Sequence, residues 1–185
     1  MSGDASIQDL FQLLVNDLER TEAICQEITE AFSQGRKVLV LTERTEHLDA
    51  ILRGLFGKVP TPFVLHGRVS KKQRATVITE LESLPADAPR ILLATGKLVG
   101  EGFDHPPLDT LVLAMPVSWK GTLQQYAGRL HREHVTKTDV RVIDFVDAGH
   151  PALLRMWDKR QRGYKAMGYR MVDQYALDAR SGDID

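Results

Sequence analysis

The sequence predicts an α/β domain in which helices cover both faces of a mainly parallel sheet of five or more strands. Two observations predict this class: short apolar runs recur along the chain, and segments with helical periodicity separate them. The apolar runs lie within the segments 37–44, 63–66, 91–94, 108–116 and 140–146. The 185 residues suit one such domain, which can bury roughly 70% of its unfolded surface.

Helices are expected before and between these runs. Residues 6–34 should form one or two helices, because apolar residues keep helical spacing there, namely Ile7, Leu10, Phe11, Leu14, Ile24, Ile28 and Phe32. A further helix is expected near 46–56, and a capping box formed by Ser70 and Gln73 should begin another. The predicted division of the chain is a helical N-terminal segment packed on the core at 1–34, the sheet-containing domain at 35–170, and a frayed tail at 171–185.

A final helix should begin at Pro151 and complete the domain. Its apolar residues are Leu153, Leu154, Met156 and Trp157, and its basic residues are Lys159, Arg160, Arg162 and Lys165. The pattern favours anchoring of Trp157 and Tyr164 on the sheet while the basic groups stay in water. Stacking of the two rings on nucleotides is the alternative.

Composition limits the partners and the compartment. With 24 basic and 25 acidic residues the net charge is −1, so any binding of nucleic acid must rely on a local patch. The single cysteine, Cys25, cannot form an internal disulfide and indicates a reducing cytoplasm. No signal peptide and no apolar run of 18 residues is present, which argues against a membrane role. His131 and His134 lack further ligands at suitable spacing, so no metal site is predicted.

The segment 125–132 carries the most informative spacing in the chain. On a helix, one face would present Gln125, Gly128, Arg129 and Arg132. The opposite face would bury Leu123, Tyr126, Ala127 and Leu130. Two arginines one turn apart, on a helix held by its apolar face, form a preorganised clamp for the charge that develops on a transferring phosphoryl group.

A solvated basic helix face is the alternative for this segment. Gly128 argues against it, because an internal helix glycine costs about 1 kcal/mol relative to alanine and suits a place where something approaches the backbone closely. Thr122 and Gln125 also form a capping box that should begin the helix. An amide oxygen that caps the helix cannot also bind a nucleotide, so the two roles of Gln125 compete.

A glycine-rich loop follows the apolar run at 91–94. Its informative residues are Thr95, Gly96, Gly100, Gly102 and Asp104. The spacing of the glycines does not match a dinucleotide fingerprint, and two prolines after Asp104 prevent a helix from starting there. An ordinary strand-to-loop turn is the alternative, but the distance to the arginine segment favours a functional loop.

Polar residues also follow the first apolar run. Thr42, Glu43 and Arg44 should lie at the carboxyl end of that strand, where open α/β sheets place their ligands. Lys71 and Lys72 begin the helix after Ser70, and both a solvated first turn and a contact with DNA are compatible with them.

Together these segments resemble the C-terminal domain of superfamily 2 helicases and translocases, the second of their two RecA-like domains. Gln-x-x-Gly-Arg-x-x-Arg at 125–132 is similar to the sixth signature motif, the loop at 95–104 to the fifth, and the strand at 37–44 to the fourth. The resemblance covers about residues 18–170. It implies a three-layer RecA-like fold with a helical N-terminal extension and a C-terminal helix.

The resemblance also implies roles for individual residues. Arg129 and Arg132 would be arginine fingers, and Gln125 would lie near the γ-phosphate and the attacking water. The residues implied to contact ATP are Gly102, Asp104 and Gly128. The residues implied to contact the nucleic-acid backbone are Thr42, Thr95 and Gly96.

Half of such an active site is missing from the sequence, which contains neither Gly-x-x-x-x-Gly-Lys-[Ser/Thr] nor an Asp-Glu-x-His or Asp-Glu-Ala-Asp run. The resemblance then implies that an N-terminal RecA-like domain of the same parent protein binds most of ATP and Mg²⁺, and that the isolated chain is inactive.

The order of the motifs resembles DNA-directed repair helicases and restriction-associated translocases. Gly96 departs from the aspartate of many DEAD-box relatives, so DNA is the expected nucleic-acid partner. A non-catalytic RecA-like module that binds a protein or nucleic acid is the alternative function.

Overall fold

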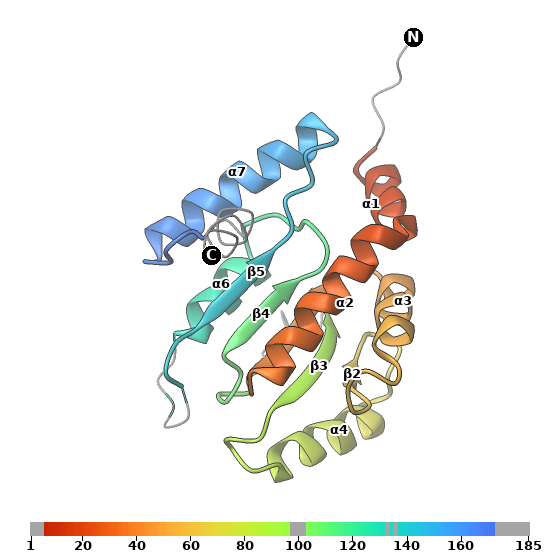
Figure 1. The fold of residues 1–185 in the computed structure, drawn as a ribbon, viewed down its shortest axis with the longest axis vertical. Helices are drawn as coiled ribbons and strands as arrows, with labels where there is room; N and C mark the ends of the chain where they lie inside the picture. Colours follow the sequence, from red (N-terminus) through yellow and green to blue (C-terminus); the bar gives the residue numbers. More distant parts are fainter. Residues whose placement is uncertain (1–5, 97–102, 132–133, 135–136, 173–185) are drawn as a thin grey trace, which may run out of the picture.

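The computed structural model describes residues 6–96, 103–131, 134 and 137–172. Within them five strands form one sheet in which all neighbouring pairs are parallel (Figure 1). In chain order they are β1 (Lys37–Thr42), β2 (Phe63–Leu65), β3 (Arg90–Thr95), β4 (Thr110–Leu113) and β5 (Arg141–Asp144). Across the sheet the order is β2-β3-β1-β4-β5, so β1 is central. The predicted parallel α/β sheet is confirmed.

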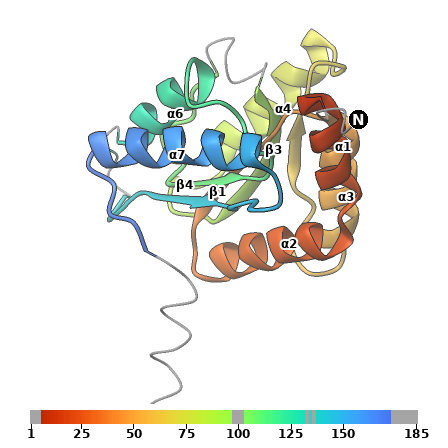
Figure 2. The ribbon, with the colours of Figure 1, turned by 90° about the horizontal axis from the view of Figure 1, so that it is seen from above.

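Helices cover both faces of this sheet. They are α1 (Ile7–Asn16), α2 (Leu18–Ser33), α3 (Thr45–Leu55), α4 (Lys71–Ser83), α6 (Thr122–Leu130) and α7 (Pro151–Ala166). Helices α2 and α3 lie on one face of the sheet, and α4 and α6 lie on the other (Figure 2). The side chains of each pair form a separate core layer with the sheet. None of the helices in the described ranges is both long enough and apolar enough to cross a membrane.

The central strand shows why the apolar runs are continuous. Val38 and Val40 pack in the layer of α2 and α3, whereas Leu39 and Leu41 pack in the layer of α4 and α6. Every residue of β1 is therefore buried, as expected for a parallel strand covered on both faces. A third cluster joins Leu10 and Phe11 of α1 to Met115, which follows β4, and to Leu153 of α7. This cluster fixes α1 and the start of α7 beyond the carboxyl end of β4.

The two predicted capping boxes have different outcomes. Ser70 caps α4 and exchanges hydrogen bonds with Gln73, as expected. The box predicted at Thr122 and Gln125 is wrong, because the N-cap of α6 is Gly121, which has no side chain to accept a capping bond. Gly121 has a φ of 76°, a backbone conformation that glycine adopts without strain, and with it the chain turns into α6 one residue earlier than predicted.

The final helix is anchored by charged and aromatic groups together. Arg160 is 0% exposed and makes a two-pronged ion pair with Asp144, the last residue of β5. Tyr164 also donates its hydroxyl to Asp144, at 2.9 Å, and its ring meets Trp119 edge to face. The predicted anchoring by Tyr164 is confirmed. The expectation that the basic residues of this helix stay in water is wrong for Arg160, because its side chain lies on the face that the helix buries.

Candidate nucleotide and nucleic-acid site

Helix α6, which ends at Leu130, carries the first six residues of the predicted arginine motif on an amphipathic surface. Its buried side chains are the four predicted ones, Leu123, Tyr126, Ala127 and Leu130. On the other side Gln125 and Gly128 are exposed and Arg129 is half-buried. The apolar face therefore fixes the helix on the sheet and points the polar face outward, as the spacing predicts.

A direct contact joins α6 to the end of the glycine-rich loop. Nη1 of Arg129 donates to the backbone carbonyl of Phe103 at 3.0 Å. Phe103 immediately precedes Asp104, which is exposed. The pKa of the buried Tyr126 hydroxyl is raised by burial and by the charge of Asp104, and the charge of Arg129 acts in the opposite direction. The structure thus brings the predicted sixth-motif arginine and the fifth-motif aspartate to one place.

The polar face of α6 leaves room for a ligand. Among the described residues, a side-chain carbon added at Gly128 would meet only the Met167 methyl group, at 4.0 Å, which is an ordinary van der Waals contact. The fold itself therefore does not require glycine at this position. With Gly121 as the N-cap, the amide of Gln125 is not engaged in capping, so the expected competition between its two roles does not arise.

The carboxyl ends of β1 and β3 place Thr42 beside Thr95 in the parallel register. Thr42 is 0% exposed, and its hydroxyl lies 2.9 Å from Nδ1 of His47. Burial and the charge of Arg20 lower the pKa of His47 to about 4, so this ring is neutral at physiological pH. In this conformation the Thr42 hydroxyl cannot reach an external phosphate, which conflicts with its predicted contact. Thr95 is 8% exposed.

Gly96 lies close to the carboxylate of Glu43, which follows the neighbouring strand β1. A side-chain carbon at position 96 would lie 2.7 Å from Oε1 of Glu43. Burial raises the pKa of the Glu43 carboxyl above its usual range. An aspartate at position 96 would bring a second carboxylate against this one, which is unfavourable for both charges. Glu43 is exposed and its carboxylate is the far end of a flexible side chain, so it can move aside, and this contact alone does not require glycine at position 96.

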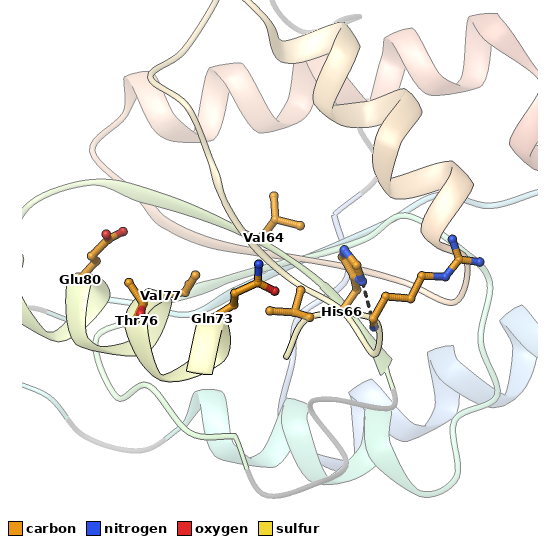
Figure 3. Close-up of a pocket in the computed structure, with 8 residues that line it drawn as sticks. Val64, His66, Gln73, Thr76, Val77 and Glu80 are labelled. Carbon is orange, nitrogen blue, oxygen red and sulfur yellow. Dashed lines mark hydrogen bonds between the residues drawn. The ribbon is translucent and has the colours of Figure 1, made fainter. Parts of the chain in front are cut away.

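A shallow pocket of about 480 Å³ lies at the edge of the sheet that β2 forms, between the end of β2 and α4 (Figure 3). Val64 and Val77 supply apolar surface, and polar side chains around them include His66, Gln73 and Glu80. The Nδ1 atom of His66 accepts a hydrogen bond from the backbone N–H of Arg68, which fixes the turn after β2. None of the predicted site residues lines this pocket.

The helicase conserved C-terminal domain family matches residues 19–134 of the chain. The chain belongs to this family. The family predicted from the motifs is thereby confirmed. The matched residues include all of α2 except Leu18, and the whole of β1 and α6. The match ends before α7, which therefore lies outside the family region.

Curated relatives and a solved structure agree with this assignment. Transcript termination protein A18 of fowlpox virus is 29% identical over 170 residues, 88% of this chain and 36% of A18. The probable helicase D10 of Escherichia phage T5 is 26% identical over 140 residues, 76% of this chain and 30% of D10. The chain spans about a third of the length of each relative.

The crystal structure of T4 UvsW superposes with a TM-score of 0.68 at 20% sequence identity, over 91% of this chain and 36% of UvsW. At this level of identity the likeness concerns the fold, and it confirms the predicted RecA-like architecture.

Two predicted site residues of this helicase domain, Arg132 and Gly102, lie outside the described residues. In the part of the chain that the structure describes, no group of three or more His, Cys, Asp or Glu side chains could hold a metal ion. The sequence did not indicate Phe103 or Tyr169, which both bond to α6. Phe103 acts through its backbone, so no side-chain pattern could have revealed it.

Proposed function

We propose that this helicase C-terminal domain is the second motor domain of an ATP-dependent DNA helicase or translocase. Arg129 and Arg132 act as arginine fingers on ATP that is bound mainly by the preceding RecA-like domain, and Gln125 lies near the γ-phosphate. The contact between Arg129 and the Phe103 carbonyl carries this proposal. It holds a guanidinium beside Asp104, and among the described residues no carboxylate pairs with that guanidinium.

The chemistry of these groups fits a nucleotide phosphate. A guanidinium bonded to one neutral carbonyl keeps its positive charge and other N–H groups for an anion, and its planar fork matches phosphate oxygens. Asp104 and Gly102 would contact the nucleotide from the loop, and the open space at Gly128 lets the phosphates approach the helix. Mg²⁺ and the β-phosphate need ligands of the other motor domain, which supplies the Walker motifs.

Nucleic acid is proposed to bind where β3 ends. Thr95 and Gly96 contact backbone phosphates there, so binding depends on the phosphate charge and is nearly indifferent to sequence. Thr42 acts indirectly, because its buried hydroxyl bonds to His47 and supports the neighbouring strand end. A role in DNA repair or restriction and a cytoplasmic location belong to the same proposal.

Alanine substitutions of the two arginines test the finger role. In an enzyme that contains both motor domains, Arg129→Ala and Arg132→Ala should each lower kcat by about 10³ to 10⁵ and leave nucleotide affinity nearly unchanged. The reason is that a finger binds charge that develops only in the transition state. Lysine should rescue poorly because it lacks the planar fork. Arg162→Ala, which changes an exposed arginine of α7, is the matched control.

Near-normal kcat in both variants would rule out the fingers and favour the non-catalytic module. The isolated chain should show no ATP turnover, and steady turnover that Arg132→Ala abolishes would contradict the proposed division of the site.

Fluorescence anisotropy tests the nucleic-acid edge. Unrelated single strands should bind the chain weakly and with similar affinity, and binding should weaken as salt increases. Thr95→Val, which removes the hydroxyl and keeps the shape of the side chain, should weaken the binding of every strand to the same extent. A strong preference for one sequence would exclude recognition of the backbone alone.

A further inference from the structure

The C-terminal end of α6, which carries Arg129, is held by groups from outside the helix. The last four carbonyls of any α-helix lack partners inside it, and in α6 these belong to residues 127–130. The Ala127 carbonyl accepts the hydroxyl of Tyr169 at 3.0 Å. The Leu130 carbonyl accepts Nζ of Lys137 at 3.2 Å. The turn of backbone next to Arg129 is therefore fixed by tertiary hydrogen bonds.

Tyr169 is itself held firmly after the end of α7. Its backbone N–H donates to the Tyr164 carbonyl at 3.0 Å, and Gly168, with a φ of 91°, makes the turn that allows this bond. Its ring lies 4.7 Å from the His131 ring, and it meets the Tyr164 ring edge to face at 5.9 Å. Burial raises the pKa of Tyr169 to about 12, so the hydroxyl stays protonated and can donate at neutral pH.

The helix that precedes Tyr169 is fixed in turn to the sheet. Arg160 and Tyr164 both bond to Asp144 at the end of β5. A continuous chain of contacts therefore runs from the sheet, through α7, to the carbonyl of Ala127. Tyr169 lies beyond residue 134, where the family match ends, so this link is not part of the matched helicase region.

We infer that Tyr169 is a positioning residue that latches the end of α6 and so holds Arg129 in the geometry needed at the phosphate. This inference rests on the proposed function, because the position of Arg129 matters for turnover only if Arg129 is an arginine finger. Ala127 precedes Arg129 by two residues, and loosening of the last turn would move the guanidinium away from the Phe103 carbonyl. A displacement of about 1 Å at a catalytic group can cost about 10² in rate.

Hydrogen exchange on the 185-residue chain tests the latch independently of catalysis. Tyr169→Phe removes one hydroxyl and keeps the ring. The amides of residues 128–131 should then exchange about fivefold to tenfold faster, the factor expected when one hydrogen bond is lost from a local opening equilibrium. Arg162→Ala is the control, because this exposed arginine of the same helix pairs with Asp158 and takes no part in the contacts that hold Tyr169. This control should leave exchange in α6 within about twofold.

Turnover in an enzyme with both motor domains tests the purpose of the latch. Tyr169→Phe should lower kcat about threefold to tenfold and change KM for ATP less than about twofold. Added to Arg129→Ala it should have no further effect on kcat, because Tyr169 acts on catalysis only through the position of the Arg129 guanidinium.

Three results would overturn the inference, and they separate it from the proposed function. Unchanged exchange in α6 means that no latch exists. Faster exchange with normal kcat, in an enzyme that Arg129→Ala inactivates, means that Arg129 needs no latch. Normal kcat in both Tyr169→Phe and Arg129→Ala overturns the proposed function, and with it the purpose given to Tyr169.

Discussion

Two arginines on neighbouring helices differ in the number and the charge of the groups that bind them. Arg160 of α7 has no exposed surface, and it bonds to both oxygens of Asp144 and to the Val117 carbonyl. Arg129 of α6 is half-buried and bonds to one neutral carbonyl. The charge of Arg160 is neutralised inside the protein, whereas among the described residues no carboxylate pairs with Arg129.

The difference has a physical origin in desolvation. A guanidinium removed from water needs a carboxylate and bonds for its remaining N–H groups, and Asp144 and Val117 supply them for Arg160. Such an arginine cannot release its partner without a large cost. Arg129 keeps part of its hydration and can exchange water for phosphate oxygens. The number and charge of the partners therefore separate a structural arginine from a catalytic candidate.

The largest effect on stability is expected at the buried pair. Arg160→Ala leaves the Asp144 carboxylate buried without its counter-ion, so the free energy of unfolding of the chain should fall by about 3–5 kcal/mol. Urea denaturation followed by circular dichroism measures this. Arg162→Ala removes an exposed pair with Asp158 in the same helix and should change stability by no more than about 0.5 kcal/mol. Equal effects of the two substitutions would contradict the structural role of Arg160.

A smaller effect should follow from pH at the loop that binds Arg129. Nε2 of the buried His105 lies 3.0 Å from Nη1 of Arg90, so the ring must be neutral to accept this bond. Burial and the charge of Arg90 lower the pKa of His105 to about 4 in the folded chain, against about 6.5 when unfolded.

The stability that depends on neutral His105 is complete above about pH 6.5 and decreases as the pH falls to about 4, by roughly 1.4 kcal/mol per pH unit. Between pH 6.5 and pH 5 the chain should lose about 2 kcal/mol that His105→Gln does not lose. Unfolding curves of both proteins at the two pH values provide the comparison. An identical pH dependence would show that His105 does not titrate as its burial requires.

The smallest effects should distinguish two helix glycines. A side-chain carbon at Gly163 of α7 would lie 2.0 Å from the Trp119 ring, so Gly163→Ala should destabilise the chain by roughly 1–2 kcal/mol despite the better helix propensity of alanine. Gly128→Ala of α6 meets open space and should be neutral or stabilising by up to about 1 kcal/mol. Thermal unfolding of both variants is sufficient. Destabilisation by Gly128→Ala would show that the fold, and not a ligand, requires this glycine.

Periodicity predicted most of the fold because each strand and helix repeats its apolar residues at its own spacing. The same rule could have predicted that Arg160 is buried. Leu153, Arg160 and Tyr164 follow one another at intervals of seven and four residues and therefore share a helix face. An arginine on an apolar face needs a buried acid, and Asp144 at the end of the last strand was the available partner.

Other features could not be read from the sequence. The hydroxyl of Thr42 is hydrogen-bonded to His47, five residues later, and only the packing of α3 on β1 brings the two side chains together. Phe103 binds Arg129 through a backbone atom, and Tyr169 reaches α6 from beyond the last helix. These contacts depend on tertiary placement, which local patterns do not specify. For Arg132 and Gly102 the roles stay predictions.

The most direct test is a paired measurement of turnover and stability for Arg129→Ala and Arg160→Ala in one enzyme with both motor domains. Turnover is measured well below the unfolding temperature of each variant, so that loss of fold does not imitate loss of chemistry. Arg129→Ala should lower kcat by at least about 10³ and change the free energy of unfolding by less than about 1 kcal/mol. Arg160→Ala should instead lower the free energy of unfolding strongly and leave kcat nearly unchanged. Near-normal turnover in Arg129→Ala, or unfolding as severe as that of Arg160→Ala, would contradict the assignment of Arg129 to catalysis.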